Sequence, residues 1–129
     1  MVRVLLIDDD EINNFTVEAV LGKVDFIKNY EIKESGWEAL DYLKRSEEEG
    51  QFPDLILVDI NMPEMDGHEF IERYEAIFWQ KHPTTKISML SSSISESDRK
   101  KSMAYSSVSE YAFKPLTKEK LATIAIPKT

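Results

Sequence analysis

The sequence lacks cysteine and contains few glycines, few prolines and no long apolar run. Without cysteine, disulfide bonds and thiolate metal sites are both excluded. Four glycines and five prolines in 129 residues are too few for a low-complexity or linker-rich chain. The apolar stretch VRVLLI near the N-terminus runs at once into three aspartates, unlike a secretory signal peptide, and no apolar run approaches the length of a membrane span. We therefore expect a cytoplasmic protein without a membrane partner.

Basic residues are also scarce. The 16 Lys and Arg side chains are outnumbered by 24 Asp and Glu side chains, so the net charge is −8. Non-specific nucleic-acid binding draws its affinity from Lys and Arg on phosphates, so we expect no direct nucleic-acid binding. The basic run Arg99–Lys101 is typical of a solvated helix face. Hydrophobic residues make up 42% of the chain, enough for the core of one domain. We therefore expect a single domain over residues 1–129 and no second domain.

Five short apolar segments recur along the chain and predict strands. They are Val2–Ile7, Tyr30–Ile32, Leu55–Val58, Ile87–Leu90 and Tyr111–Phe113. Continuous apolar runs of this length are typical of strands that are buried on both faces of a parallel sheet. Helical patterns separate them, and strand alternating with helix predicts a parallel sheet with helices on both faces.

Five amphipathic patterns predict the helices between and after these strands. Their expected apolar faces are Ile12, Phe15, Ala19 and Val20; Trp37, Leu40 and Leu43; Phe70, Ile71, Tyr74, Ile77 and Phe78; a weakly apolar stretch over residues 95–105; and Leu121, Ile124 and Ala125. Ser95 and Thr117 are expected N-caps, and Pro127 is expected to end the last helix.

Polar residues follow the predicted strands at the edge where ligands bind in such sheets. They are Asp8, Asp9 and Asp10; Asp59; Ser91, Ser92 and Ser93; and Lys114 with Pro115. Carboxylates that lie close together raise one another's pKa unless a cation compensates them, and oxygen-only ligands favour Mg²⁺. A lysine and a hydroxyl facing such a site would bind a phosphoryl group. Asp59 could then act as a nucleophile and form an aspartyl phosphate.

Each of these residues also has an ordinary structural interpretation. An Asp run before a helix is often an N-cap with favourable charge, and Asp10 fits that role. A single Asp before a turn often serves the turn, and a triple serine is often a polar loop. The arrangement of all of them at the ends of different predicted strands favours a common site.

Four motifs in order carry a resemblance to a known family. They are LLIDDD, LVDINMPEMDG, ISMLSS and YAFKP, and together they extend over nearly the whole chain. The chain resembles the response regulator receiver domain of bacterial two-component signalling, of the single-domain type. The resemblance implies a flavodoxin-like, doubly wound (βα)5 fold with a five-stranded parallel sheet of order 2-1-3-4-5.

The same resemblance implies roles for individual residues. The phosphoacceptor would be Asp59. A Mg²⁺ (or Mn²⁺) ion would be held by Asp8, Asp9, Asp59 and the backbone carbonyl of Asn61. The phosphoryl group would be contacted by Ser91 and Lys114, and the conformational switch would use Ser91 and Tyr111. The resemblance further implies a cis Lys114–Pro115 bond.

The resemblance also implies a phosphoacceptor with self-catalysed phosphotransfer and slow autodephosphorylation rather than an enzyme. The donor would be a phosphohistidine on a sensor histidine kinase or a histidine phosphotransfer protein. The signal would leave by contact with a protein target or through a phosphorelay, and both remain open. We expect a monomer before phosphorylation. The sequence departs from the family at Ser92 and in the SSVS segment, residues 106–109.

Two other classes of protein were weighed. LLIDDDEI nearly fits the motif of a small Mg-dependent phosphatase of the haloacid-dehalogenase type, with Asp8 as nucleophile and Asp10 as acid/base. Ile12 breaks the last position of that motif, and no late pair of acids follows the fourth strand. A flavodoxin is disfavoured because three aspartates after the first strand would repel the flavin phosphate.

Overall fold

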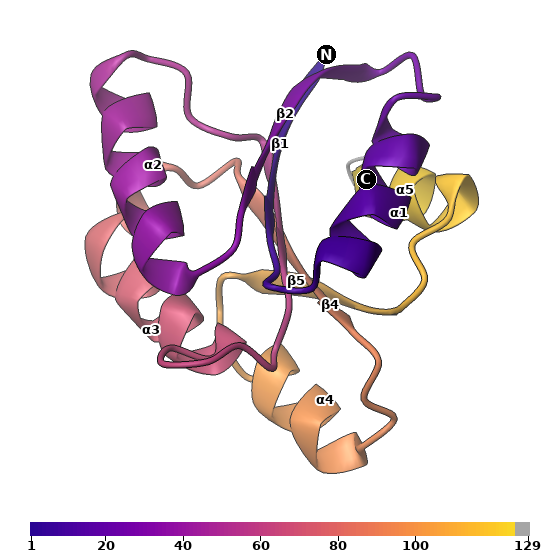
Figure 1. The fold of residues 1–129 in the computed structure, drawn as a ribbon. Helices are drawn as coiled ribbons and strands as arrows, with labels where there is room; N and C mark the ends of the chain where they lie inside the picture. The colour runs from indigo at the N-terminus through magenta and orange to yellow at the C-terminus, as the bar shows by residue number, and fades with distance from the viewer. Residues whose placement is uncertain (126–129) are drawn as a thin grey trace.

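The computed structural model describes residues 1–125, in which strands and helices alternate (Figure 1). The elements are β1 (Val2–Ile7), α1 (Glu11–Leu21), β2 (Ile27–Lys33), α2 (Gly36–Glu48), β3 (Leu55–Val58), α3 (Gly67–Ile77), the short 3₁₀ helix η1 (Trp79–Lys81), β4 (Lys86–Ser91), α4 (Glu96–Met103), β5 (Val108–Phe113) and α5 (Lys118–Ala125). No helix within residues 1–125 combines the length and apolar character needed to cross a membrane.

The five strands form one parallel sheet in the order β2-β1-β3-β4-β5. In Figure 1, α1 and α5 lie on one side of the sheet and α2 and α3 on the other, while α4 lies at the lower end. The predicted flavodoxin-like fold and its strand order are therefore confirmed.

The apolar character of the central strands follows from this two-sided cover. In β3, Leu55 and Leu57 pack in the core beneath α1 and α5, whereas Ile56 and Val58 pack in the core beneath α2 and α3. Successive side chains of a strand point to opposite faces of the sheet. A strand that is covered on both faces must therefore be apolar at every position, as β3 is.

The edge strands were harder to delimit from the sequence. β2 and β5 are longer than the predicted segments 30–32 and 111–113, because polar residues interrupt their apolar pattern. The predicted caps are confirmed: Ser95 Oγ accepts the Asp98 N–H at 3.3 Å, and Thr117 Oγ1 accepts the Lys120 N–H at 3.1 Å. Pro127, the expected end of the last helix, lies outside the described residues.

The prediction for the buried face of α1 was wrong for three of its four residues. Ile12 and Phe15 are 82% and 78% exposed, and Ala19 is exposed as well, whereas Val20 is partly buried against the core. The residues that face the sheet are Asn14, Val17 and Leu21. Both sets follow the same i, i+3, i+7 spacing, so periodicity alone does not distinguish them. The side chain of Asn14 donates to the backbone carbonyl of Asp8 at 2.9 Å, which fixes the rotation of the helix.

Two apolar residues of α2 and α3 are also more exposed than predicted. Trp37 is 48% exposed and Ile77 is 49% exposed. The guanidinium of Arg73 lies 4.7 Å from the centre of the Trp37 ring, so a cation–π contact covers part of this surface. The remaining predicted positions Phe70, Ile71, Tyr74 and Phe78 of this region are buried.

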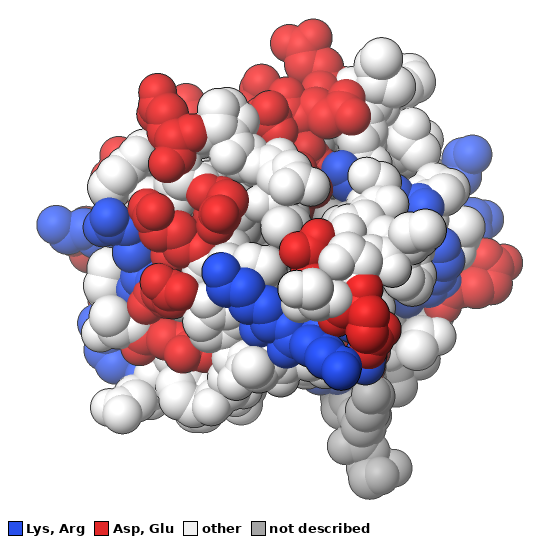
Figure 2. Space-filling view, turned by 90° about the horizontal axis from the view of Figure 1, so that it is seen from below, with Lys and Arg blue, Asp and Glu red and all other residues white. Residues whose placement is uncertain are grey.

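Helix α4 is attached to the rest of the molecule largely by polar contacts. Its one buried residue is Ser102, whose Oγ lies 2.8 Å from Nε2 of His68 on α3. Just after α4, the Tyr105 hydroxyl donates to the carboxylate of Glu72 on α3. Figure 2 views the end of the molecule where α4 lies and shows a short band of Lys and Arg among patches of Asp and Glu. The basic run 99–101 on α4 is exposed, as expected for a solvated face.

Candidate functional site at the carboxyl edge of the sheet

Three carboxylates meet where β1 and β3 end. Asp8 and Asp9 follow β1, and Asp59 follows β3, its direct neighbour in the sheet. The backbone N–H of Asp59 donates to the carbonyl of Ile7 at 2.9 Å, so pairing of the strands extends to the site. One carboxylate oxygen from each of the three acids lies within 4.8 Å of the others. Asp8 and Asp59 are buried, whereas Asp9 is exposed and leaves the site open to solvent.

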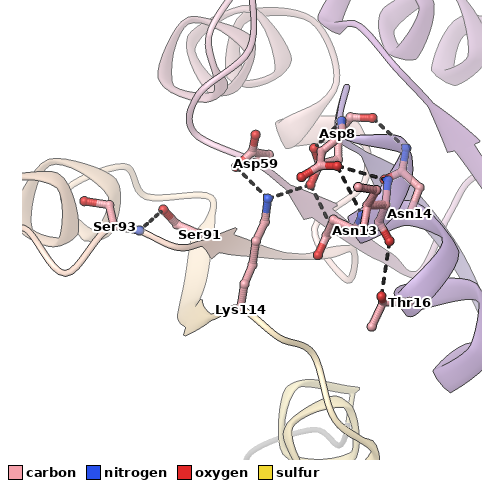
Figure 3. Close-up of polar contacts among 10 residues, drawn as sticks. Asp8, Asn13, Asn14, Thr16, Asp59, Ser91, Ser93 and Lys114 are labelled. Atoms are coloured by element: carbon pink, nitrogen blue, oxygen red, sulfur yellow. Dashed lines mark hydrogen bonds and ion pairs between the residues drawn. The ribbon is translucent and has the colours of Figure 1, made fainter.

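Lys114, which follows β5, extends its side chain into this group of acids (Figure 3). Its Nζ lies 2.8 Å from Oδ2 of Asp8 and 3.3 Å from Oδ1 of Asp59. Burial by itself would lower the pKa of Lys114, but the ion pairs with Asp8 and Asp59 outweigh burial and raise it. Lys114 is therefore a charged ammonium at neutral pH. The bond between Lys114 and Pro115 is cis, as the family resemblance implied.

The surroundings of the Asp59 carboxyl strongly perturb its pKa. Burial and the neighbouring charge of Asp8 raise its pKa to about 6, although Lys114 opposes the shift. Three close carboxylates and one ammonium leave an excess of negative charge at this point. The donor set consists of oxygen atoms, which suits a hard divalent cation such as Mg²⁺ or Mn²⁺. The residues present therefore fit such an ion.

Asp8 is held in place by neighbours that the sequence interpretation did not single out. The Asn13 side chain donates to Asp8 Oδ2 at 2.8 Å, and the Asp10 backbone N–H donates to Asp8 Oδ1 at 2.9 Å. Asn14 binds the carbonyl of the same residue, as described above. The signal in the sequence was the pair of asparagines three and four positions after Asp10. These bonds orient Asp8 toward Lys114 and Asp59 (Figure 3).

Asp10, the third acid of the run, has a different function. Its Oδ1 accepts the backbone N–H groups of Ile12 at 3.0 Å and Asn13 at 3.3 Å. These are the bonds of a helix N-cap, and the side chain is exposed. Asp10 therefore caps α1, as its ordinary structural interpretation predicted, and does not join the carboxylates.

Ser91 and Tyr111 lie near the site but contact a different residue. Ser91 is fully buried at the end of β4, and its Oγ accepts the backbone N–H of Ser93 at 3.0 Å. In Figure 3 the Ser91 hydroxyl points toward Ser93 rather than toward Asp59 and Lys114. The Tyr111 hydroxyl donates to the carbonyl of Ser93 at 3.1 Å. Sequence interpretation did not identify Ser93 as the common partner.

The loop after β3 carries Asn61 and returns the chain to α3. The N–H of Gly67 donates to the carbonyl of Ile60 at 2.7 Å, which closes the loop tightly behind Asp59. Glu64 in this loop has a positive φ of 67°. Asn61 follows Asp59 by two positions in this loop, and it is exposed.

Comparison with known proteins places this geometry in context. The family model described as "Response regulator receiver domain" matches residues 4–126. The two-component response regulator ORR41 of Oryza sativa subsp. japonica is 33% identical over 124 residues, which are 96% of this chain and 91% of the rice protein.

Two solved structures are similar over nearly their whole length. A two-component response regulator from Cytophaga hutchinsonii has a TM-score of 0.89 and 33% identity, covering 95% of this chain and 92% of that one. The Mn²⁺-bound form of response regulator Rcp1 has a TM-score of 0.76 and 25% identity, covering 97% of this chain and 90% of that one.

Proposed function

Because the chain belongs to the response regulator receiver family of two-component signalling, we propose that Asp59 is its phosphoacceptor. The family is a phosphoacceptor signalling module and not a classical enzyme. The haloacid-dehalogenase alternative is not supported, since the similar proteins are response regulators and Asp10 is used as a helix cap. The observation that carries the proposal is the position of Asp59 at the end of a central strand, where Lys114 Nζ lies between its carboxylate and that of Asp8.

The transfer itself needs a nucleophile and a leaving group. We propose that the donor is a phosphohistidine on a sensor histidine kinase or a histidine phosphotransfer protein. A carboxylate oxygen of Asp59 attacks phosphorus and the P–N bond breaks, with its electron pair going to nitrogen. The donor imidazole, which carries a proton on its other ring nitrogen, leaves as the neutral ring. Lys114 already holds Oδ1 of Asp59, so Oδ2 is the oxygen that remains for attack. The requirement on this chain is positioning and charge compensation rather than proton transfer by a side chain.

Charge compensation would come from two sources. Asp8, Asp9, Asp59 and the backbone carbonyl of Asn61 would hold Mg²⁺ or Mn²⁺, which offsets charge between the acids and the incoming phosphoryl group. Lys114 would pair with the phosphoryl oxygens once Asp59 carries them. Ser91 would donate its hydroxyl to another phosphoryl oxygen, for which the hydroxyl must turn away from Ser93.

A protein-borne phosphohistidine must make contact around the acids to reach Asp59. Helix α1 begins directly after them, and it presents Ile12 and Phe15 to solvent. Ile94, in the loop that follows β4, is 90% exposed. We propose that this exposed apolar rim is the contact surface for the donor protein.

Since phosphohistidine is made from ATP, we also propose that the reaction takes place in the cytoplasm.

The direct test is phosphorylation with a small-molecule donor. The protein is incubated with acetyl phosphate and Mg²⁺, and its intact mass is measured. We expect one added phosphoryl group on the wild type and none on Asp59→Asn or in the presence of EDTA. Asp10→Asn is the matched control, because it neutralises an adjacent acid while keeping a good N-cap, and it should be phosphorylated like the wild type.

Two results would contradict the proposal. The first is a folded wild type that gains no phosphoryl group in the presence of Mg²⁺. The second is an adduct that persists on Asp59→Asn, because the acceptor would then be another residue. Loss of the adduct in Asp10→Asn would instead mean that the acids that follow β1 contribute to the reaction beyond the helix cap.

A further inference from the structure

Ser93 connects three separate elements through its three polar groups. Its backbone N–H donates to Oγ of Ser91 at the end of β4, at 3.0 Å. Its hydroxyl donates to Oδ2 of Asp98 in the first turn of α4, at 2.7 Å, and accepts the backbone N–H of Ser95, at 3.2 Å. Its carbonyl accepts the hydroxyl of Tyr111 on β5, at 3.1 Å. One residue outside the acidic site therefore contacts both residues expected to move and the helix beside them.

The contact with Asp98 matters because α4 has little else to hold its first turn. The helix buries no apolar side chain, and its one buried residue, Ser102, lies near its other end. A hydrogen bond to an ionised carboxylate is stronger than one between neutral groups. Ser95 caps the same turn by accepting the Asp98 N–H, but it makes no bond to Ser91 or Tyr111 among the contacts described. The Ser93–Asp98 bond is thus a direct tie between α4 and the Ser91 hydroxyl.

We propose that Ser93 is a positioning residue that couples the Ser91 hydroxyl to helix α4. Its bond to Asp98 holds both in the arrangement of the unphosphorylated protein. This inference rests on the proposed function, in which the Ser91 hydroxyl must turn toward a phosphoryl group on Asp59. That turn breaks the bond from the Ser93 N–H, so Ser93 is freed to shift and to release Asp98. The two arrangements form a two-state equilibrium, and the Ser93–Asp98 bond favours the arrangement of the unphosphorylated protein.

The size of this bias follows from the kind of bond. A hydrogen bond to a charged group that is made in one state alone shifts the equilibrium by about 10-fold or more. Ser93→Ala removes the bond to Asp98 and the weaker bond from the Ser95 N–H, and it leaves the two backbone bonds of residue 93 in place. More molecules then have the Ser91 hydroxyl free to meet the incoming phosphoryl group. We expect the variant to be phosphorylated about 10-fold faster or more.

The test measures the rate of phosphorylation by acetyl phosphate in Mg²⁺ for four proteins. They are the wild type, Ser93→Ala, Asp98→Ala and the double variant. Each single variant should be faster, and the double variant should be no faster than Ser93→Ala, because both changes remove the same Ser93–Asp98 bond. Ser93→Thr keeps the hydroxyl and should restore the wild-type rate. A folded Ser93→Ala with an unchanged or lower rate would overturn the inference, as would additive effects in the double variant.

Ser95→Ala is the matched control for loosening of the helix. It deletes the same side chain two positions away and removes the N-cap of α4, while the bond between Ser93 and Asp98 remains. It should lower stability but leave the rate of phosphorylation unchanged. Equal acceleration in Ser95→Ala would mean that any weakening of α4 suffices, which would refute a specific role for Ser93.

A second readout does not depend on phosphorylation. The Ser93 amide should exchange its hydrogen faster in Asp98→Ala than in the wild type, because loss of the tie frees Ser93 from Ser91. Unchanged exchange would overturn the coupling even if no variant were phosphorylated. Failure of the wild type to accept a phosphoryl group would instead refute the proposed function, so the two failures are distinguishable.

Discussion

Gly67 lies where α3 passes directly behind the proposed phosphoacceptor, and its replacement tests the close fit of this loop. A Cβ at position 67 would lie 2.8 Å from Cα of Ile60 and 3.0 Å from the carbonyl carbon of Asp59, and closer still to the Asp59 carbonyl oxygen. All three atoms belong to the backbone, so no side-chain rotation relieves the contact. In Gly67→Ala the chain between β3 and α3 must move.

The expected magnitude follows from these distances. Carbon atoms pack at about 3.5 to 4.0 Å, so the loop must shift by about 1 Å. Such overpacking costs about 1–3 kcal/mol, while replacing glycine in a helix returns about 0.5–1 kcal/mol. We expect Gly67→Ala to lose about 1–2 kcal/mol of unfolding free energy. Because a 1 Å misplacement of reacting groups costs about 100-fold in rate, phosphorylation of Asp59 should slow much more than stability suggests.

Urea denaturation and the acetyl phosphate reaction measure the two effects separately. Gly22→Ala is the matched control, since its new Cβ would meet the Glu18 carbonyl oxygen at 3.4 Å, an ordinary contact. Gly36→Ala is a second control, because the obstacle there is the flexible side chain of Met65. If Gly67→Ala were as stable as the wild type and were phosphorylated at the same rate, the argument from backbone contact would be wrong.

Two pH-dependent effects follow from buried groups. In metal-free buffer the pKa of Asp59 is about 6 in the folded protein against 3.8 in the unfolded chain, so the folded state binds the proton more tightly. Protonation of Asp59 therefore stabilises the fold fully at low pH, and this stabilisation is lost as the pH rises through 6. Asp59→Asn should therefore gain about 2–3 kcal/mol of unfolding free energy relative to wild type between about pH 4 and pH 7, and a constant difference in urea titrations would contradict this. For His68, burial and the charge of Lys101 lower the pKa in the folded protein. The contribution of neutral His68 to stability is therefore fully present above the pKa of the unfolded chain, and it is lost as the pH falls through the pKa of the folded protein. Thermal unfolding of His68→Gln, which can still donate to Ser102, should show a flatter acid limb than wild type, and parallel limbs would count against the assignment.

The sequence predicted the positions of the central strands and the meeting of their terminal residues. Val2–Ile7 and Leu55–Val58 have the predicted bounds, because strands covered on both faces leave a nearly continuous apolar signal, which Arg3 alone interrupts. Asp8 and Asp59 meet because their strands are neighbours and parallel. These outcomes depend on periodicity and topology, which a sequence records well. The chemical roles of these acids remain predictions.

The sequence did not predict features that depend on contacts between distant elements. The rotation of α1 is decided by the bond from Asn14 to Asp8, because two residue sets on that helix share one spacing. The role of Ser93 depends on where β5 and α4 place Tyr111 and Asp98. Neither composition nor periodicity distinguishes Ser93 from the two other serines of its loop. Hydrogen-bond partners of this kind are set by tertiary structure.

The polar attachment of α4 has a thermodynamic consequence. Heat-capacity changes and denaturant sensitivity both scale with the apolar surface that becomes exposed. Since α4 buries no apolar side chain, its detachment would expose little of that surface. The free energy of such a movement would depend little on urea, and its calorimetric signal would be small. The amide hydrogens of α4 would nevertheless exchange through local opening. The helix can therefore change position at a cost set by a few hydrogen bonds, and the two cores on either side of the sheet remain closed.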